Sequence, residues 1–479
     1  MDKIMDIIIH DKDVKRKIEI LQILNKRQTF VSSCEISDQL KCSSRTILND
    51  ISQLKKDIPN NWDIISIKSK GHRLVRPISE SINCIIATYI KESLVYKVLM
   101  GIFNNKHYSL EKWSQKLYVN KITLKNILKK LNETLNQVNL ELKFRVIRLE
   151  GEERDIRCLY IAFFCFIQKY IKQIDIHCPL KKRIRFILEF YEIEMDLNLL
   201  TSIIDVCTKR IFDKKYVESG MEMKIGYESN QLECYNMINS ILEECYRLKI
   251  PENEKNVLNL CYFLASKNTR EVKNQDINYY HDLYKKNYEK FRVLLNTLAI
   301  ENETSAMVRE GLVSDIGSTL YKIQLMNDYD IALQYFFSTP NNLSCELQEI
   351  YEKNYAIISL WNTVYNNDQF TRHQIHFIIS SSTFLFYSRQ NKRNVLLLFS
   401  GTTVEEKLVY SKLKKELGNY ANIYSIWSTT KQYDFIIANY HVVNCEVPAI
   451  YISQNCNRKE IDNIKKIMNK KTDKINIMT

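Results

Sequence analysis

Four polar side chains recur along one side of a segment near the start of the chain. Because a helix turns by about 100° per residue, a helix would place them on a single face. They bring donors and cations and no acid: Arg45, Asn49, Ser52 and Lys56. Arginine pairs bidentately with guanine and asparagine with adenine, so this face has the chemistry to contact bases in the major groove of DNA. An ordinary amphipathic surface helix would show the same pattern.

An apolar stripe on the opposite side of this segment would hold the helix against its neighbours. Its members follow at i, i+4, i+7 and i+11: Ile47, Ile51, Leu54 and Ile58. Ser43 is suited to cap the helix. Two helices are predicted before it, one over residues 13–25 and one from Ser32 or Ser33 to Leu40, with Lys41-Cys42-Ser43 as the turn.

A β-wing is predicted after these helices. Asp63–Ile67 and Arg73–Arg76 have the composition of short strands, and Gly71 supplies turn geometry between them. Helix, turn, helix and wing together favour a DNA-binding unit that ends at Pro77. Base edges are the predicted partners of Arg45, Asn49 and Ser52. The other predicted DNA contacts of this unit are Ser44, Thr46, Lys55, Lys56, Lys68, Lys70 and Arg73.

A weak second copy of the unit follows at an offset of 77 residues. The offset aligns Ile36 with Trp113, Ser43 with Asn120, and Leu54 with Leu131. It predicts helices over Ser109–Leu117 and Lys121–Val138, with wing-like strands over Phe144–Arg148. Its predicted DNA contacts are Lys121 and Lys125, and Lys129 would also face outward. The alternative is that the copy serves only as a packing module.

Charge is concentrated in this part of the chain. Residues 1–157 hold 29 Lys and Arg against 19 Asp and Glu, a net +10 out of +13 for all 479 residues. A localised basic excess suits a polyanionic partner such as double-stranded DNA, although a solvated face has the same composition.

Several protein classes are disfavoured. No apolar run reaches the roughly 18 residues of a membrane span, and residues 1–10 are too short and acidic for a signal peptide, so we expect a cytoplasmic protein without a membrane partner. The 13 cysteines include no Cys-x-x-Cys, so we expect reduced thiols, no metal and no cofactor. No grouping typical of a catalytic site occurs, and we predict a non-enzyme.

The remainder of the chain changes character twice. With only 9 Gly and 6 Pro, helices should dominate, and two helical-bundle domains are predicted over 156–275 and 276–390. From 391 onward, apolar strands alternate with helices, which predicts a small parallel sheet. The loop Ser400–Thr403 begins a predicted helix and could hold a phosphate on its amides, or be an ordinary turn.

This order of domains resembles the Mga and AtxA-like family of bacterial transcription regulators. The residues that carry the resemblance are the helix pair Cys34–Leu54, the wing Lys68–Gly71, the junction Gly151–Arg157 and the strand and loop Val395–Thr403. The resemblance implies a mainly α, multidomain fold: two winged helix-turn-helix units, two phosphotransferase-system regulation domains and a C-terminal enzyme-IIB-like α/β domain. The implied boundaries are 1–77, 78–155, 156–275, 276–390 and 391–479. It also implies a homodimeric DNA-binding activator of virulence-type genes, whose bundle histidines accept phosphate from phosphotransferase carrier proteins.

The chain departs from the family at the phosphate-accepting positions. Asn198 and Ser380 occupy the places aligned with the regulatory histidines, and Ser400 replaces the acceptor cysteine. A serine lacks the thiolate of a phosphoryl acceptor. The candidate phosphorylation sites are therefore His373 and His376, with His177 and His281 as the other bundle histidines, and each is more often a structural residue. The alternative function is a phosphotransfer-responsive signalling protein with little DNA specificity; an RNA-binding antiterminator is disfavoured by the two winged units.

Overall fold

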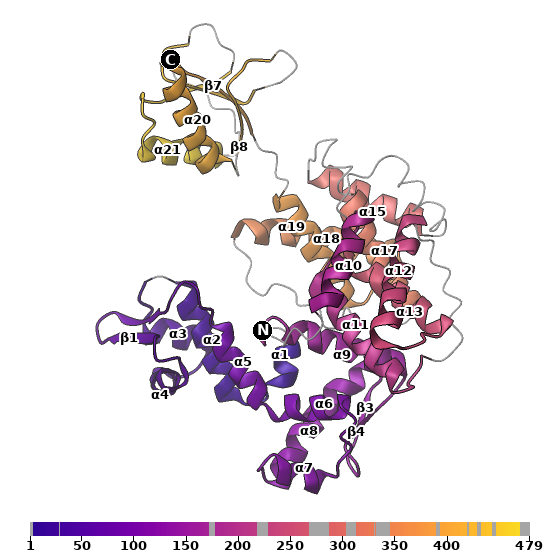
Figure 1. Cartoon of the computed structure of the whole chain (residues 1–479). Helices are drawn as coiled ribbons and strands as arrows, with labels where there is room; N and C mark the ends of the chain where they lie inside the picture. Colours follow the sequence, from indigo (N-terminus) through magenta and orange to yellow (C-terminus); the bar gives the residue numbers. More distant parts are fainter. Residues whose placement is uncertain are drawn as a thin grey trace.

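The chain folds into a mainly helical assembly and a separate α/β lobe, shown in Figure 1 as a computed structural model. A continuous apolar core runs from Ile4 to Phe386, and the α/β lobe has its own. The structure describes residues 3–27, 29–171, 178–217, 229–267, 287–302, 313–329, 331, 345–388, 393–418, 421–428, 433–442 and 447–469. Among these, no helix is both long and apolar enough to cross a membrane.

The first unit has the predicted helix-turn-helix and wing, although the second wing strand begins at Gly71 and ends at Val75 and was predicted over Arg73–Arg76. Its elements are α1 (Lys3–Ile8), α2 (Lys12–Lys26), α3 (Ser33–Leu40), α4 (Ser44–Asp57), β1 (Asp63–Ile67) and β2 (Gly71–Val75). Helix α1 was not predicted. It buries Ile4, Met5 and Ile8 and packs on helices of the next two regions, so the N-terminal residues belong to the shared core.

The second unit repeats the arrangement, again with two helices before the helix-turn-helix. Its elements are α5 (Asn83–Glu92), α6 (Leu94–Phe103), α7 (Leu110–Lys116), α8 (Lys121–Leu135), a 3₁₀ turn (Asn136–Val138), β3 (Glu141–Lys143) and β4 (Arg148–Glu150). The predicted strands over Phe144–Arg148 are wrong, since residues 144–147 form the turn between β3 and β4. Asn139, in the left-handed conformation with φ 56°, ends the 3₁₀ turn and starts the hairpin earlier than expected.

Helices fill the next two regions, as predicted. The first contains α9 (Glu153–Ile167), α10 (Cys178–Phe190), α11 (Leu197–Phe212), α12 (Ser229–Tyr246) and α13 (Glu252–Ala265), with a small unpredicted sheet of β5 (Glu194–Met195) and β6 (Ser266–Lys267). The second contains α15 (Tyr288–Glu301), a π-helix (Val313–Gly317), α17 (Ser318–Asp328), α18 (Cys345–Val364) and α19 (Arg372–Ser388).

The C-terminal lobe confirms the predicted parallel sheet. Its strands β7 (Arg393–Leu398), β8 (Ala421–Tyr424), β9 (Phe435–Ala438) and β10 (Ala449–Tyr451) lie in the order β10-β9-β7-β8, all parallel. Helices α20 (Thr403–Leu417) and α21 (Arg458–Asn469) pack on the face that carries Val395 and Leu397. Leu396 and Ile436 enter a second small core, since alternate strand residues point to opposite faces.

Candidate nucleic-acid interface

Helix α4 presents the predicted polar face to solvent. Ile47, Ile51 and Leu54 are buried, and Ser43 Oγ accepts the amide of Thr46 at 3.1 Å, which confirms the predicted stripe and cap. The opposite face is exposed along its whole length: Arg45, Asn49, Ser52 and Lys56. Ser44 and Lys55 are also exposed, and Thr46 is partly buried.

Helix α3 supports α4 through a tightly defined turn. Ser32 is the cap of α3: its hydroxyl accepts the amide of Glu35 at 3.1 Å, and the Glu35 carboxylate accepts the amide of Ser32 at 2.9 Å. Lys41 then adopts the left-handed conformation, with φ 50°, and directs the chain into α4. The sequence allowed either Ser32 or Ser33 as the cap of α3, and this capping box identifies it as Ser32.

A buried ion pair fixes α4 to α2. Asp50 lies on α4 with its side chain 4% exposed, and Arg16 of α2 donates to both of its oxygens, at 3.1 Å from Nη2 to Oδ1. The hydrogen bond from Arg16 to the Asp50 carboxylate raises the pKa of Arg16 above its usual value. The pair joins residues 34 positions apart and was not predicted.

The wing is a hairpin with an added bridge. Strands β1 and β2 pair antiparallel from Asp63 opposite Val75 to Ile67 opposite Gly71, and the amide of Val31 donates to the carbonyl of His72 at 2.9 Å. Gly71 has φ +101°, and a side chain there would overlap the Val31 carbonyl, so the bridge requires glycine.

The predicted wing cations lie in different environments. Lys68 and Lys70 are exposed at the tip, where they can reach phosphate. Arg73 is partly buried, and its guanidinium stacks over Phe30 with 5.1 Å to the ring centre. Its predicted phosphate contact remains a prediction, and its observed packing holds the wing against the segment before α3.

His72 is a structural residue of this unit that sequence reasoning missed. It is buried, with Nε2 at 2.8 Å from Ser33 Oγ and Nδ1 at 2.9 Å from Ser66 Oγ, so it links the start of α3 to the wing. Burial, followed by the nearby Lys55 charge, lowers the pKa of His72. A lone histidine after glycine gives no sequence signal for this role.

The second unit exposes a comparable face on α8. Lys125, Asn126 and Lys129 are exposed opposite the buried Leu124, Leu128 and Leu131. Lys121 is also exposed but forms an ion pair with Glu111, and the hydrogen bond from Lys121 lowers the pKa of Glu111 to about 2.

Backbone geometry supports the repeat. Tyr118 has φ 54° and lies 77 residues after Lys41, which has φ 50°, so both turns use a left-handed residue at the same point. Asn120 caps α8 by accepting the amide of Ile122 at 2.8 Å, as its alignment with Ser43 predicts.

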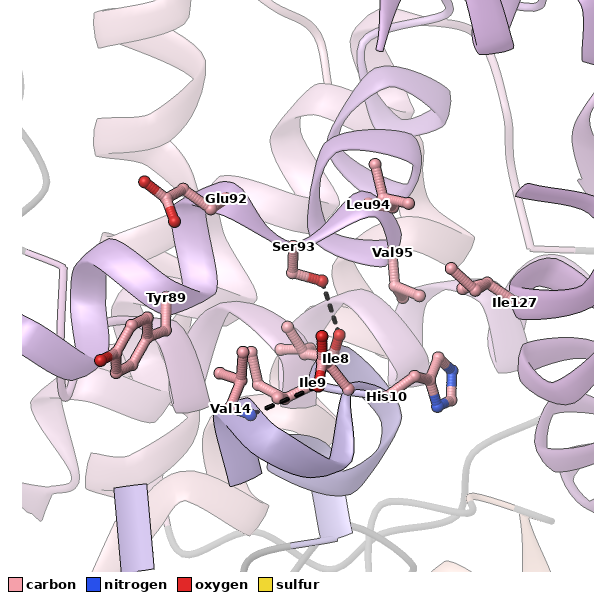
Figure 2. Close-up of a pocket in the computed structure, with 11 residues that line it drawn as sticks. Ile8, Ile9, His10, Val14, Tyr89, Glu92, Ser93, Leu94, Val95 and Ile127 are labelled. Carbon is pink, nitrogen blue, oxygen red and sulfur yellow. Dashed lines mark hydrogen bonds between the residues drawn. The ribbon is translucent and has the colours of Figure 1, made fainter. Parts of the chain in front are cut away.

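Direct contacts join the two units. The hydroxyl of Tyr89 on α5 donates to Asp57 at the end of α4, and Ser93 Oγ donates to the carbonyl of Ile8 at 2.6 Å. Figure 2 shows this Ser93 bond beside a pocket of about 200 Å³ to which His10 and Ile127 also contribute. Tyr89 therefore ties α4 to the second unit, and Ser93 ties the second unit to α1.

The positions that the resemblance aligns with the family's regulatory histidines lie far from this interface in sequence. Asn198 is exposed near the start of α11, whereas Ser380 is buried in α19 and donates to the carbonyl of His376 at 2.8 Å. His376 Nδ1 lies 2.7 Å from the hydroxyl of Tyr351, and His373 is partly buried on the same helix. His177 and His281 lie outside the described residues.

Backbone amides of the Ser400–Thr403 loop already donate hydrogen bonds to neighbouring side chains. The amide of Ser400 donates to Asn439 Oδ1 at 2.7 Å, and that of Thr402 donates to Glu405 Oε2 at 2.8 Å. Thr402 and Glu405 form a capping box for α20. These bonds favour the ordinary turn over the phosphate loop.

Fold and surface together define a chain with tandem helix-turn-helix domains, and comparison with known proteins agrees. Residues 16–73 match a family described as an HTH domain, and residues 79–164 match the Mga helix-turn-helix domain. The second match extends beyond the predicted boundary at 155 into α9.

Curated relatives share the same N-terminal third. The chain is 31% identical over 154 residues to the capsule synthesis positive regulator AcpB of Bacillus anthracis, 32% of each chain. It is 25% identical over 157 residues to the anthrax toxin expression trans-acting positive regulator of the same organism, 33% of each chain. It is 24% identical over 154 residues to a putative trans-acting regulator of Streptococcus pneumoniae, 32% of this chain and 31% of that protein. The aligned region thus spans about a third of these relatives.

By these matches, the N-terminal third is similar to helix-turn-helix transcription regulators of the Mga/AtxA type.

Proposed function

We propose that this protein is a DNA-binding transcription regulator that acts as a positive regulator. The observation that carries the proposal is the exposed face of α4, where Arg45 and Asn49 point away from a fully buried apolar stripe. The relatives that share this region are named positive regulators of capsule synthesis and toxin expression, which supports activation of virulence-type genes.

The contacts divide by chemistry. Arg45, Asn49 and Ser52 reach base edges in the major groove, where arginine and asparagine side chains discriminate between bases. The surrounding cations, with Ser44 and Thr46 at the start of α4, hold the backbone phosphates and set the register without reading sequence. In the second unit Lys125 and Lys121 extend the contact along the duplex.

The rest of the chain supplies regulation and assembly in this proposal. The helical regions act as phosphotransferase-system regulation domains, over 156–275 and 276–390. His373 and His376, both in the second region, are its candidate phosphate acceptors. The lobe from 391 acts as an enzyme-IIB-like dimerisation module, and exposed Val404 and Trp427 give it apolar surface for a second copy. Incubation with purified phosphocarrier proteins, followed by intact-mass measurement, tests phosphorylation, and no gain in mass would exclude it. Sedimentation of the full-length protein tests whether it forms a dimer.

Arg45→Ala tests the DNA contact. A duplex selected from a random library by the full-length protein is titrated by fluorescence anisotropy against a scrambled duplex. Loss of a bidentate guanine contact costs about 1–3 kcal/mol, so affinity for the selected duplex should fall roughly 5- to 150-fold, with little change for the scrambled one.

Arg292→Ala is the matched control, because Arg292 is an exposed arginine on α15. It removes the same charge and should leave both affinities unchanged. An equal loss on both duplexes for Arg45→Ala would reduce Arg45 to a phosphate contact, and no binding by the wild-type protein would reject the function.

A further inference from the structure

A cavity of about 380 Å³ lies where the second helix-turn-helix unit meets the first helical region. One side comes from the second unit, through Ile102 at the end of α6, His107 and Leu149. The other comes from the helical region, through Tyr160 of α9, Arg210 of α11 and Lys215. No contact assigned to the DNA interface involves these residues, and the space is within the usual range for small-molecule sites.

The carboxylates at the cavity already have partners. Glu153 accepts Arg210 Nε at 2.7 Å and Arg157 Nε at 3.1 Å, and Arg157 is further paired with the buried Glu254 at 2.6 Å. Glu150 accepts Arg148 Nε at 2.7 Å. The acids therefore leave little negative charge for the other cations that line the space.

Lys215 is a cation of the cavity wall without a direct carboxylate partner among the described residues. Its backbone is fixed, because its amide donates to the Arg210 carbonyl at 3.0 Å and its carbonyl accepts Arg157 Nη2 at 2.8 Å. Within the described part of the chain its ammonium group has no ion-pair or hydrogen-bond partner, whereas nearby Lys209 is paired with Asp213 at 2.7 Å. Burial, then the charge of Arg210, lowers the pKa of Lys215, while the charges of Glu153 and Asp213 oppose the shift.

His107 faces the same excess of positive charge. Burial, then the charges of Lys215, Arg148 and Arg210, lowers the pKa of His107, while a bond to the Ile147 backbone opposes the shift. The carboxylates of Glu150 and Glu153 also line the cavity, but both are engaged by arginines. An anion placed between these groups would relieve the repulsion and favour a proton on His107.

We propose that this cavity binds a small metabolite that carries a phosphate monoester. A phosphate monoester has a charge of about −1.5 to −2 at pH 7, which matches Lys215 together with a proton taken up by His107. Free phosphate has no carbon skeleton to contact the apolar part of the wall, and a cavity of about 380 Å³ has the size of sites that hold whole small molecules. The apolar surfaces of Ile102, Leu149 and Tyr160 suit the carbon skeleton of such a ligand.

The site goes beyond the proposed DNA contact and is tested without DNA. Isothermal titration calorimetry of the full-length protein uses glycerol 3-phosphate, inorganic phosphate and glycerol, at pH 6.5 and 7.5. We expect saturable binding of glycerol 3-phosphate, weaker binding of phosphate and none of glycerol. Titrations in buffers of different ionisation enthalpy should reveal proton uptake, and binding should tighten at the lower pH.

Two lysine variants decide whether binding occurs at this cavity. Lys215→Gln should weaken glycerol 3-phosphate binding on the order of tenfold or more, since a charged hydrogen-bond partner is lost. Lys214→Gln removes an exposed lysine one position earlier and should have no effect. His107→Gln should abolish the proton uptake. Failure of the wild-type protein to bind glycerol 3-phosphate at millimolar concentration, or equal losses in the two lysine variants, would overturn the proposal and leave the DNA contact untouched.

Discussion

Arg16→Met should loosen α4, the helix proposed to contact DNA, without changing its exposed face. The substitution keeps much of the side-chain length but leaves Asp50, only 4% exposed, without its cationic partner. Because a buried charge without a partner is costly, α4 should open more readily from α2. DNA affinity should fall only in proportion to the loss of molecules in which α4 is packed on α2.

The size of the effect follows from burial. Removing one partner of a buried ion pair costs about 3–5 kcal/mol. Arg16 is 19% exposed and retains contact with water, so we expect the lower end, about 3 kcal/mol. At about 1.4 kcal/mol per factor of ten, α4 amides should exchange with solvent roughly 100-fold faster.

Hydrogen exchange of the full-length protein, followed by mass spectrometry, measures this directly. Peptides from α4 should lose protection, while those from β7 in the C-terminal lobe should be unchanged and serve as the internal control. The double variant Arg16→Met/Asp50→Leu carries no buried charge and should recover most of the protection. A change below about threefold in the single variant, or no recovery in the double, would refute the reasoning.

Three further substitutions test the supports of the same unit. Gly71→Ala should destabilise the wing by about 2 kcal/mol or more, because φ +101° is strained for alanine and its Cβ would overlap the Val31 carbonyl. The control is Gly317→Ala, which should be tolerated because its Cβ would have its nearest neighbour at 3.7 Å. Hydrogen exchange of the β2 amides measures the effect of both variants on the wing. Ser43→Ala should cost about 1 kcal/mol by removing the α4 cap, seen as faster exchange confined to the first turn. Folding lowers the pKa of His72, so just below pH 6.5 the unfolded unit binds more protons than the folded one, and stability should fall as the pH drops through that value. His72→Phe should remove this part of the pH dependence of hydrogen exchange in the wing. An unchanged dependence of exchange on pH would exclude His72 as its source.

The elements that sequence predicts well are those whose signal is local. The apolar stripe of α4, its Ser43 cap and the apolar strand predicted over Val395–Phe399 each depend on neighbours in the chain. The stripe and cap were confirmed, and the strand was confirmed with the bounds Arg393–Leu398. Residues 144–147 were misassigned because strands of three residues are too short to show alternation. Helix α1 was missed since its six residues become helical through packing on distant helices.

In the candidate site, too, features with a local sequence signal could be predicted and those that depend on long-range packing could not. The outward face of α4 follows from helical periodicity, so the sequence alone is enough to assign Arg45 and Asn49 to it. The contacts that hold it are long-range: Arg16 with Asp50, and His72 with Ser33, join residues 34 and 39 positions apart. The cavity at Lys215 also depends on tertiary packing, because its walls come from two separate regions of the chain.

Site-specific photocrosslinking from α4 tests the central claim most directly. A benzophenone amino acid replaces Asn49 in the full-length protein, which is bound to its selected duplex and irradiated. The control carries the same group at Glu289, an exposed position on α15. Crosslinks from position 49 that map to bases within the selected site, with none from position 289, are the predicted result. Bound duplex without a crosslink from position 49, or with one from position 289, would contradict the assignment of α4 as the DNA-reading helix.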